Sequence, residues 1–240
     1  MRSSLYCLLL TGLMACTTSA PNAITPGSGV DVDPLPPASS APGFGNSKAR
    51  PLGTPFAFPA GITLVQKPRN DSDCWYEARQ AKRIKGAGNA VAFCVSFSNS
   101  TNAPIRVELP PGLIWVAETS ALFQDISQNG ILVKTVTILV PAHAVETAWL
   151  VAYCINYDRD GTRPGDTFEA QPILSNHPGI SALAKQLATK KINEEEYASE
   201  PTAAERQQLA FIGVAVVDVQ TYGTVQPSTQ AYLNQLPNAR

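Results

Sequence analysis

The sequence predicts a mainly β protein, an antiparallel β-sandwich followed by a small C-terminal helical segment. Between residues 90 and 98, large apolar side chains alternate with smaller ones, which is the period of two of a strand with one heavily buried face. More short apolar runs follow as far as residue 157, and turn-forming residues rather than helical patterns separate them. We therefore expect a sandwich over residues 56–168 and a helical segment over residues 169–240 that packs on it.

The N-terminus has the pattern of a secretory signal peptide over residues 1–15. Arg2 precedes an apolar run from Leu5 to Leu13, and small residues follow. This run is shorter than the roughly 20 apolar residues that span a bilayer, so we do not expect a retained membrane helix. Its end, Leu13 to Cys16, resembles the lipobox of bacterial lipoproteins. The resemblance implies cleavage before Cys16 and diacylglycerol on its thiol; the alternative is an ordinary signal peptide.

The residues that follow predict where the folded part lies. Thr17 and Thr18 stand where Asp would retain a Gram-negative lipoprotein in the inner membrane, so the resemblance implies the outer membrane, with a periplasmic or surface-facing domain. In a Gram-positive host this inference does not apply. Residues 16–55 are rich in Pro, Ser, Thr and Gly and contain one aromatic residue, Phe44. Such a stretch buries too little apolar surface to offset chain entropy, so we expect a disordered tether.

Turn formers delimit the expected strands of the sandwich. Pro110 to Gly112, Asn129 with Gly130, and Pro141 interrupt the apolar runs. The expected strands cover residues 90–98, 105–109, 113–117, 131–140 and 147–157. The run from Asn99 to Leu113 resembles a segment of immunoglobulin-like repeats in bacterial surface proteins. The resemblance implies an immunoglobulin-like antiparallel β-sandwich that serves as a spacer or binding module, and it carries no catalytic residues.

The C-terminal segment predicts three helices. The first has its apolar stripe at Ile180, Leu183, Ala184, Leu187 and Ala188. Thr202 with Glu205 forms a capping-box pattern that opens the second helix, which Gly223 ends. Because this segment is rich in β-branched residues, residues 214–219 could instead form a buried strand. A last short helix is expected over residues 228–236.

Three cysteines follow the predicted signal peptide and lipidation site: Cys74, Cys94 and Cys154. An oxidising compartment favours a disulfide, and an odd number leaves one thiol over. Cys94 and Cys154 share the same parity on two expected strands, so we favour a Cys94–Cys154 pair with Cys74 as a free thiol. A hairpin turning at residues 86–88 would place Cys74 opposite residue 100, which disfavours Cys74–Cys94, although the sequence alone does not fix the connectivity.

The segment around Cys154 also resembles the thioester domains of bacterial adhesins, in which a cysteine after an aromatic residue bonds to a glutamine. The corresponding glutamine-containing stretch aligns with residues 213–217. Gly213 stands in the glutamine position and Val217 in the tryptophan position, so the bond cannot form there. Gln220 lies nearby at the wrong spacing. The resemblance therefore implies at most a surface adhesin with a degenerate thioester-like domain.

A local basic cluster is the main candidate contact surface. Trp75 and Tyr76 precede it, and its members are Arg79, Lys82, Arg83 and Lys85. Such a cluster can contact lipid phosphates, an acidic polysaccharide or an acidic protein. The alternative is an exposed edge strand protected by positive charge, a common device in natural sheets.

Other polar groups predict no metal or cofactor site. His143 and His177 have no ligand partners at suitable spacing. Residues 158–166 lack the ligand pattern of a calcium loop and fit a polar turn better, although a weak calcium site is an alternative. The glutamate run 194–196 fits a solvated helix end or linker. No nucleophile elbow or phosphate loop occurs, which leaves a hydrolase with an unrecognised site as a remote alternative.

Taken together, these features predict a non-enzymatic lipoprotein of the cell envelope with a binding or scaffolding role. Its membrane partner would be reached through the lipid anchor, and its further partner would be an envelope protein or polysaccharide. It could be an accessory of a surface, secretion, pilus or motility assembly. The net charge of -1 argues against a nucleic-acid partner.

Overall fold

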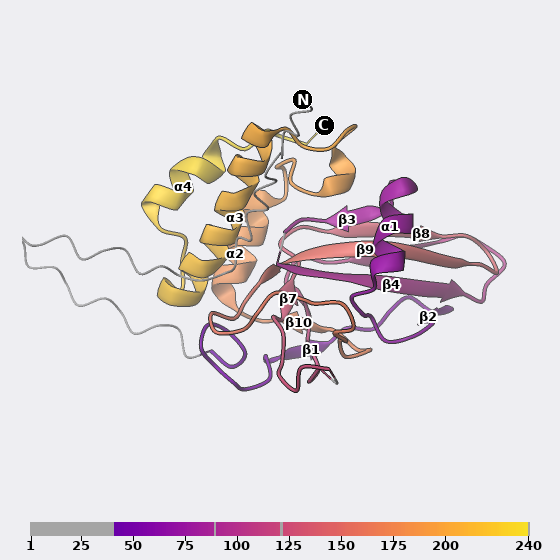
Figure 1. Ribbon diagram of the computed structural model, residues 1–240. Helices are drawn as coiled ribbons and strands as arrows, with labels where there is room; N and C mark the ends of the chain where they lie inside the picture. The colour runs from indigo at the N-terminus through magenta and orange to yellow at the C-terminus, as the bar shows by residue number, and fades with distance from the viewer. Residues whose placement is uncertain (1–40, 89, 121, 240) are drawn as a thin grey trace, which may run out of the picture.

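The structure, a computed structural model, describes residues 41–88, 90–120 and 122–239. The expected signal peptide, the lipidation at Cys16 and the tether as far as residue 40 lie outside these residues. Within them the protein is mainly β, with antiparallel sheets that curl into a half-barrel and small C-terminal helices, broadly a β-sandwich-like fold. Figure 1 shows the C-terminal helices together at one end of the sheet and an earlier helix apart from them, across the strands.

One eight-stranded sheet dominates the fold, and a two-stranded sheet faces it. The strands of the large sheet run in the order β1-β10-β6-β7-β9-β4-β2, and β3 pairs with β9 outside this order. The two-stranded sheet consists of β5 and β8. Every pairing is antiparallel except that of β3 with β9, which is parallel. The strands are β1 (Gly53–Pro55), β2 (Ile62–Leu64), β3 (Ile84–Gly86), β4 (Val91–Asn99), β5 (Ile105–Leu109), β6 (Leu113–Trp115), β7 (Gly130–Ile131), β8 (Val136–Val140), β9 (Val145–Cys154) and β10 (Ile173–Ser175).

The concave face of the large sheet holds one apolar core. The predicted alternation in β4 is confirmed, because Val91, Phe93, Val95 and Phe97 are all at most 1% exposed. These side chains pack with Trp115 and with the inner face of the β5–β8 pair. The pair therefore closes the open side of the half-barrel.

The opposite face of the sheet carries the helices. They are α1 (Ser72–Gln80), α2 (Pro178–Leu187), the 3-10 helix η1 (Glu194–Glu196), α3 (Ala203–Tyr222) and α4 (Pro227–Asn234). At one end, α2, α3 and α4 enclose a second apolar core with strand residues such as Ile114, Tyr153 and Ile155. Near the other end, α1 packs on Cys94 and Trp149. Trp149 and Tyr153 lie four residues apart on β9, so both groups of helices cover the same face.

The C-terminal helices agree closely with the predicted ones. Thr202 and Glu205 form the predicted capping box, each side chain accepting from the other's backbone N–H. Gly223 ends α3 with a φ of 79°, a left-handed conformation that glycine adopts readily. The alternative strand over residues 214–219 is wrong, because these residues continue α3. The prediction also missed β10, a strand that lies within the expected helical segment and pairs with β1 and β6.

The expected tether is wrong at its C-terminal end, because residues 41–55 are folded. Phe44 is 2% exposed and belongs to the core beneath the helices. Gly45 donates its N–H to the Ile155 carbonyl at 2.8 Å, and β1 pairs with β10. In the described part of the chain, no helix is both long and apolar enough to cross a membrane.

Candidate functional site

A groove of about 620 Å³ lies at the seam between α1 with β3 on one side and the segment 194–200 on the other. This volume is within the usual range of small-molecule pockets, and the lining is mostly polar and charged. Its first wall carries Arg79, Lys82 and Lys85 of the predicted basic cluster. Its second wall carries Glu194, Glu195, Tyr197 and Glu200. The parallel pairing of β3 with β9 places the first wall at this edge of the sheet.

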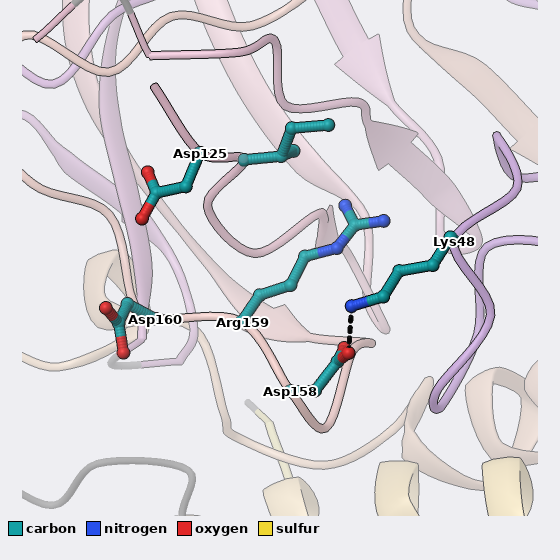
Figure 2. A pocket seen from close by; sticks show the side chains of 6 residues that line it. Lys48, Asp125, Asp158, Arg159 and Asp160 are labelled. Carbon is teal, nitrogen blue, oxygen red and sulfur yellow. Dashed lines mark hydrogen bonds and ion pairs between the residues drawn. The ribbon is translucent and has the colours of Figure 1, made fainter. Parts of the chain in front are cut away.

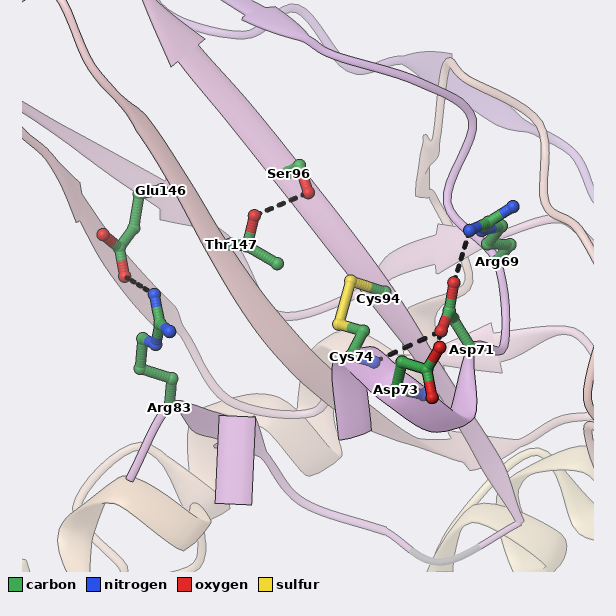
Figure 3. Close-up of a disulfide and its surroundings, with 9 residues drawn as sticks. All are labelled: Arg69, Asp71, Asp73, Cys74, Arg83, Cys94, Ser96, Glu146 and Thr147. Atoms are coloured by element: carbon green, nitrogen blue, oxygen red, sulfur yellow. Dashed lines mark hydrogen bonds and ion pairs between the residues drawn. A yellow bond between two sulfur atoms is a disulfide. The ribbon is translucent and has the colours of Figure 1, made fainter. Parts of the chain in front are cut away.

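Helix α1 holds the first wall in place through its cap and a disulfide (Figure 3). The Asp71 carboxylate caps the helix by accepting from the N–H groups of Asp73 and Cys74, at 3.0 and 3.2 Å. The hydrogen bond from Cys74, together with the Arg69 guanidinium, lowers the pKa of Asp71. Cys74 is bonded to Cys94 on β4, with a Cα–Cα distance of 6.1 Å. The helix is therefore fixed covalently to the face of the sheet.

The predicted Cys94–Cys154 disulfide and the predicted free thiol at Cys74 are wrong. Cys94 lies opposite Trp149 in the β4–β9 register, and Cys154 lies five residues further along β9. Five residues of strand span roughly 17 Å, far beyond the reach of a disulfide. The prediction failed because it assumed that Cys74 lies on a strand of a hairpin, whereas it lies on α1.

The basic cluster meets carboxylates of its own chain. Arg79 pairs with Glu200 at 2.7 Å, and Arg83 pairs with Glu146 at 3.6 Å (Figure 3 shows the second pair). Among the described residues, Lys82 and Lys85 form no ion pair. Arg79 also lies over the half-exposed ring of Trp75, with its guanidinium carbon 5.5 Å from the ring centre. The cluster thus combines two ion-paired guanidinium groups with two lysines outside these ion pairs, of which Lys85 acts through its charge on the nearby Glu195 carboxylate.

The glutamate run on the second wall contacts the fold closely instead of forming a solvated linker. Glu195 accepts the Gly86 N–H at 2.8 Å, and Glu196 forms an ion pair with Lys134. Burial raises the pKa of Glu195. Burial, and then the nearby Glu200, raises the pKa of Glu194. These partners hold the acidic wall against β3.

Tyr197 sits beside the glutamates on the same wall. Its hydroxyl donates to the Lys191 carbonyl at 3.0 Å, and the Lys191 ammonium lies 3.8 Å from the centre of its ring. Burial and the surrounding glutamates, Glu205 first among them, raise the pKa of Tyr197 to about 12. Tyr197 is therefore protonated at physiological pH, and Lys191 contacts both its hydroxyl and its ring.

A second, smaller pocket of about 290 Å³ lies where residues 158–160 meet residues 48 and 125–126 (Figure 2). Asp158 forms an ion pair with Lys48, and Asp125 forms one with Arg163. Burial lowers the pKa of Arg159, whose guanidinium points into the pocket. In the described part of the chain, no three acidic, histidine or cysteine side chains are grouped so that they could hold a metal ion. The carboxylates of this turn pair with cations instead.

Next to this pocket, the loop around residues 122–126 exposes large apolar side chains. Leu122 is 72% exposed, Phe123 48% and Ile126 40%. The Arg163 guanidinium covers Phe123, with its carbon 4.0 Å from the ring centre. Sequence analysis missed this surface, because the three residues lie in a loop between β6 and β7, where no strand or helix pattern marks which side chains are exposed.

The histidines and the thioester-like segment stay apart from the groove. His143 contacts Asn102 at 2.5 Å, and His177 precedes α2 and lies against the ring of Phe44. Gln220 donates from Nε2 to the Cys154 carbonyl at 3.4 Å. Alternation along β9 directs the Cys154 side chain to the concave core, away from α3, which carries Gln220. Glutamine and thiol are therefore not placed for a thioester.

No known protein family, curated protein or solved structure matches the chain.

Proposed function

We propose that the protein is an exported, lipid-anchored envelope protein with a non-catalytic binding role, and that the groove between α1 and η1 is its binding site. The observation that carries the proposal is the Leu13 to Cys16 sequence at the end of the signal-like segment. Cleavage there would leave an N-terminal cysteine for acylation, and two or three acyl chains give nearly irreversible membrane attachment.

The Cys74–Cys94 disulfide supports export, because structural disulfides persist in oxidising compartments and are rare in the cytosol. The groove supports a binding role, because it has lysines, carboxylates and the tyrosine Tyr197 on walls that are fixed to the sheet. A polar partner such as an envelope protein segment or polysaccharide fits this lining. The tether and the folded domain would hold the groove outside the lipid surface.

The test is the fractionation of cells that produce the natural chain or the Cys16→Ala variant, with Cys7→Ala as the matched control. We expect the natural chain and the control in the membrane fraction, with a mass increased by the acyl chains. Cys16→Ala should lose the lipid and leave the membrane fraction. Retention of Cys16→Ala in the membrane, or a natural chain without acyl mass, would overturn the anchor.

The binding role has a separate test, pull-down from envelope extracts with natural protein and with the Lys82→Glu/Lys85→Glu variant. A partner that the natural protein captures and the variant loses supports the groove as the binding site. Equal capture by both proteins would place the contact elsewhere on the molecule.

A further inference from the structure

The loop between β6 and β7 contains a hydrogen-bonded turn, which we call the β6–β7 turn. The Ser120 N–H donates to the Asp125 carbonyl at 2.7 Å, and the Ser120 carbonyl accepts the Gln124 N–H at 2.9 Å. The Phe123 N–H donates to the Ser120 hydroxyl at 3.3 Å. Gln124 has a φ of 58°, a left-handed conformation that costs free energy in a residue other than glycine. These bonds hold Leu122 and Phe123 at the tip of the turn.

The β6–β7 turn displays apolar side chains that the fold does not bury. Leu122, at 72%, is the most exposed large apolar residue of the described chain, and Phe123 and Ile126 are exposed on the same turn. Scattered exposed apolar residues are normal, whereas three large ones grouped on one turn are typical of an interaction site. The left-handed Gln124 adds strain of the kind that persists where a function needs a fixed backbone. These features together indicate a surface that enters an apolar medium.

The N-terminal part of the chain joins the domain beside this turn. Gly45 donates its N–H to the Ile155 carbonyl at 2.8 Å and accepts the Tyr157 N–H at 2.9 Å. Lys48 and Ile126 then line the same pocket, the one of about 290 Å³ in Figure 2. A lipid anchor at the start of the mature chain would therefore be connected to the domain next to the exposed turn. Such a connection raises the effective concentration of lipid at the turn, so that a weak apolar contact is enough.

The carboxylates around the turn are balanced by cations of the same surface. Asp125 pairs with Arg163, and Asp158 pairs with Lys48. Asp160 lies 3.7 Å from the Arg163 guanidinium as well. Because these charges compensate one another, the surface needs no anionic lipid, and the contact that we expect is mainly apolar.

Two arginines stand behind the apolar side chains. The Arg163 guanidinium carbon lies 4.0 Å from the centre of the Phe123 ring. The Arg159 guanidinium points into the pocket and forms no ion pair within the described part of the chain. Apolar side chains in front of cations are the arrangement of segments that lie at a membrane interface, where the cations reach the headgroups.

We propose that the β6–β7 turn is a membrane-contact site, whose side chains Leu122, Phe123 and Ile126 enter the boundary between the headgroups and the acyl chains. The proposal rests on the proposed function, because the anchor supplies the membrane. The contact uses none of the residues that line the groove between α1 and η1. It would therefore orient the domain on the lipid surface without occupying the groove.

Fluorescence quenching by brominated acyl chains tests the contact. The full acylated chain is placed in vesicles of phosphatidylethanolamine and phosphatidylglycerol, with Phe123→Trp as the reporter, a change that keeps a ring beneath the Arg163 guanidinium. We expect emission at shorter wavelength and quenching beyond that of the three natural tryptophans. Tyr76→Trp, an aromatic position of α1 that is 61% exposed, is the matched control and should show neither change.

A second variant tests the apolar nature of the contact. Leu122→Asp in the Phe123→Trp chain removes the most exposed side chain and adds a charge, so the ratio of lipid-bound to free turns should fall about tenfold or more. Leu139→Asp, the same change at a 56% exposed position of β8, should keep the quenching. An unchanged thermal midpoint shows that Leu122→Asp still folds.

Three outcomes would overturn the site. The first is acylated protein on vesicles in which the Phe123→Trp reporter is not quenched. The second is quenching that survives Leu122→Asp. The third is quenching that disappears in vesicles of phosphatidylcholine alone, because attraction to anionic lipid would then be the cause. The acyl mass of the same sample is measured separately: its absence overturns the anchor, whereas the three results above concern the turn.

Discussion

The two ends of the helical face are attached to the sheet in different ways. At one end, α2, α3 and α4 bury a continuous apolar core that includes Leu187 and Ile212, both 0% exposed. At the other end, α1 buries only Ala78 among its residues and is joined to β4 by the Cys74–Cys94 bond. A short polar helix is thus held to the sheet by one covalent link where the other helices rely on apolar packing, and the groove lies between the two kinds of attachment.

The largest expected effect comes from breaking the apolar attachment. Ile212→Ala removes a fully buried side chain from α3, so we expect a loss of about 2–5 kcal/mol in the free energy of unfolding. Urea unfolding followed by circular dichroism measures it. Val214→Ala, 44% exposed on the same helix, is the matched control and should change stability by at most about 0.5 kcal/mol. Equal losses in the two variants would contradict the packing that we describe.

Removal of the covalent attachment should cost less and act more locally. The cysteines are 20 residues apart in sequence, and for a loop of this length the chain-entropy model gives about 3 kcal/mol for the double variant Cys74→Ala/Cys94→Ala. Amide exchange should accelerate in α1 and stay unchanged in α2 and α3. Reduction should lower the natural protein to the stability of the variant and leave the variant unchanged; a variant that still responds to reductant would argue against this pairing.

The smallest effect concerns the acidic wall between the two attachments. Burial raises the pKa of Glu195, so the folded protein binds this proton more tightly than the unfolded chain. Its contribution to stability therefore improves as the pH falls through the folded pKa, and the gain is complete below the unfolded value. Glu195→Gln keeps an acceptor for the Gly86 N–H, so it should be more stable near pH 7 by less than about 1 kcal/mol.

This difference should shrink as the pH is lowered towards 4, and thermal unfolding across that range measures it. Glu77→Gln, exposed on α1, is the matched control and should follow the natural protein at every pH. A constant difference between Glu195→Gln and the natural protein would show that the substitution acts through packing rather than through the proton.

Local patterns predicted much of the fold. The alternation in β4 and the caps of α3 are properties of neighbouring residues, so they are visible in the sequence. Helix α1 was missed because a helix that buries a single residue, Ala78, has almost no apolar period. The expected strand at 131–140 is two strands, β7 and β8, in different sheets, since the residues between them turn.

Sequence analysis predicted only one wall of the groove, because the other wall lies far away along the chain. The basic wall is a local cluster that the sequence shows directly. The acidic wall belongs to a distant segment: Glu200, which pairs with Arg79, follows it by 121 residues in the sequence. The parallel β3–β9 pairing and the path of the chain into η1 bring the two together, and neither leaves a short-range signal. The cysteine pairing failed for the same reason, because it depends on a helix that local patterns do not reveal.

The fixed exit of the N-terminal segment has a mechanical consequence. Gly45 is held by the Ile155 carbonyl at 2.8 Å and by the buried Gln220 side chain at 3.1 Å, while Phe44 is enclosed beneath α3. A pull on the chain before residue 41 therefore loads the parallel bridge between Gly45 and Asn156, just beyond the end of β9, and not a freely peeling end. Shear of this kind breaks several bonds together, so this end of the domain should resist pulling better than a strand that peels off one bond at a time.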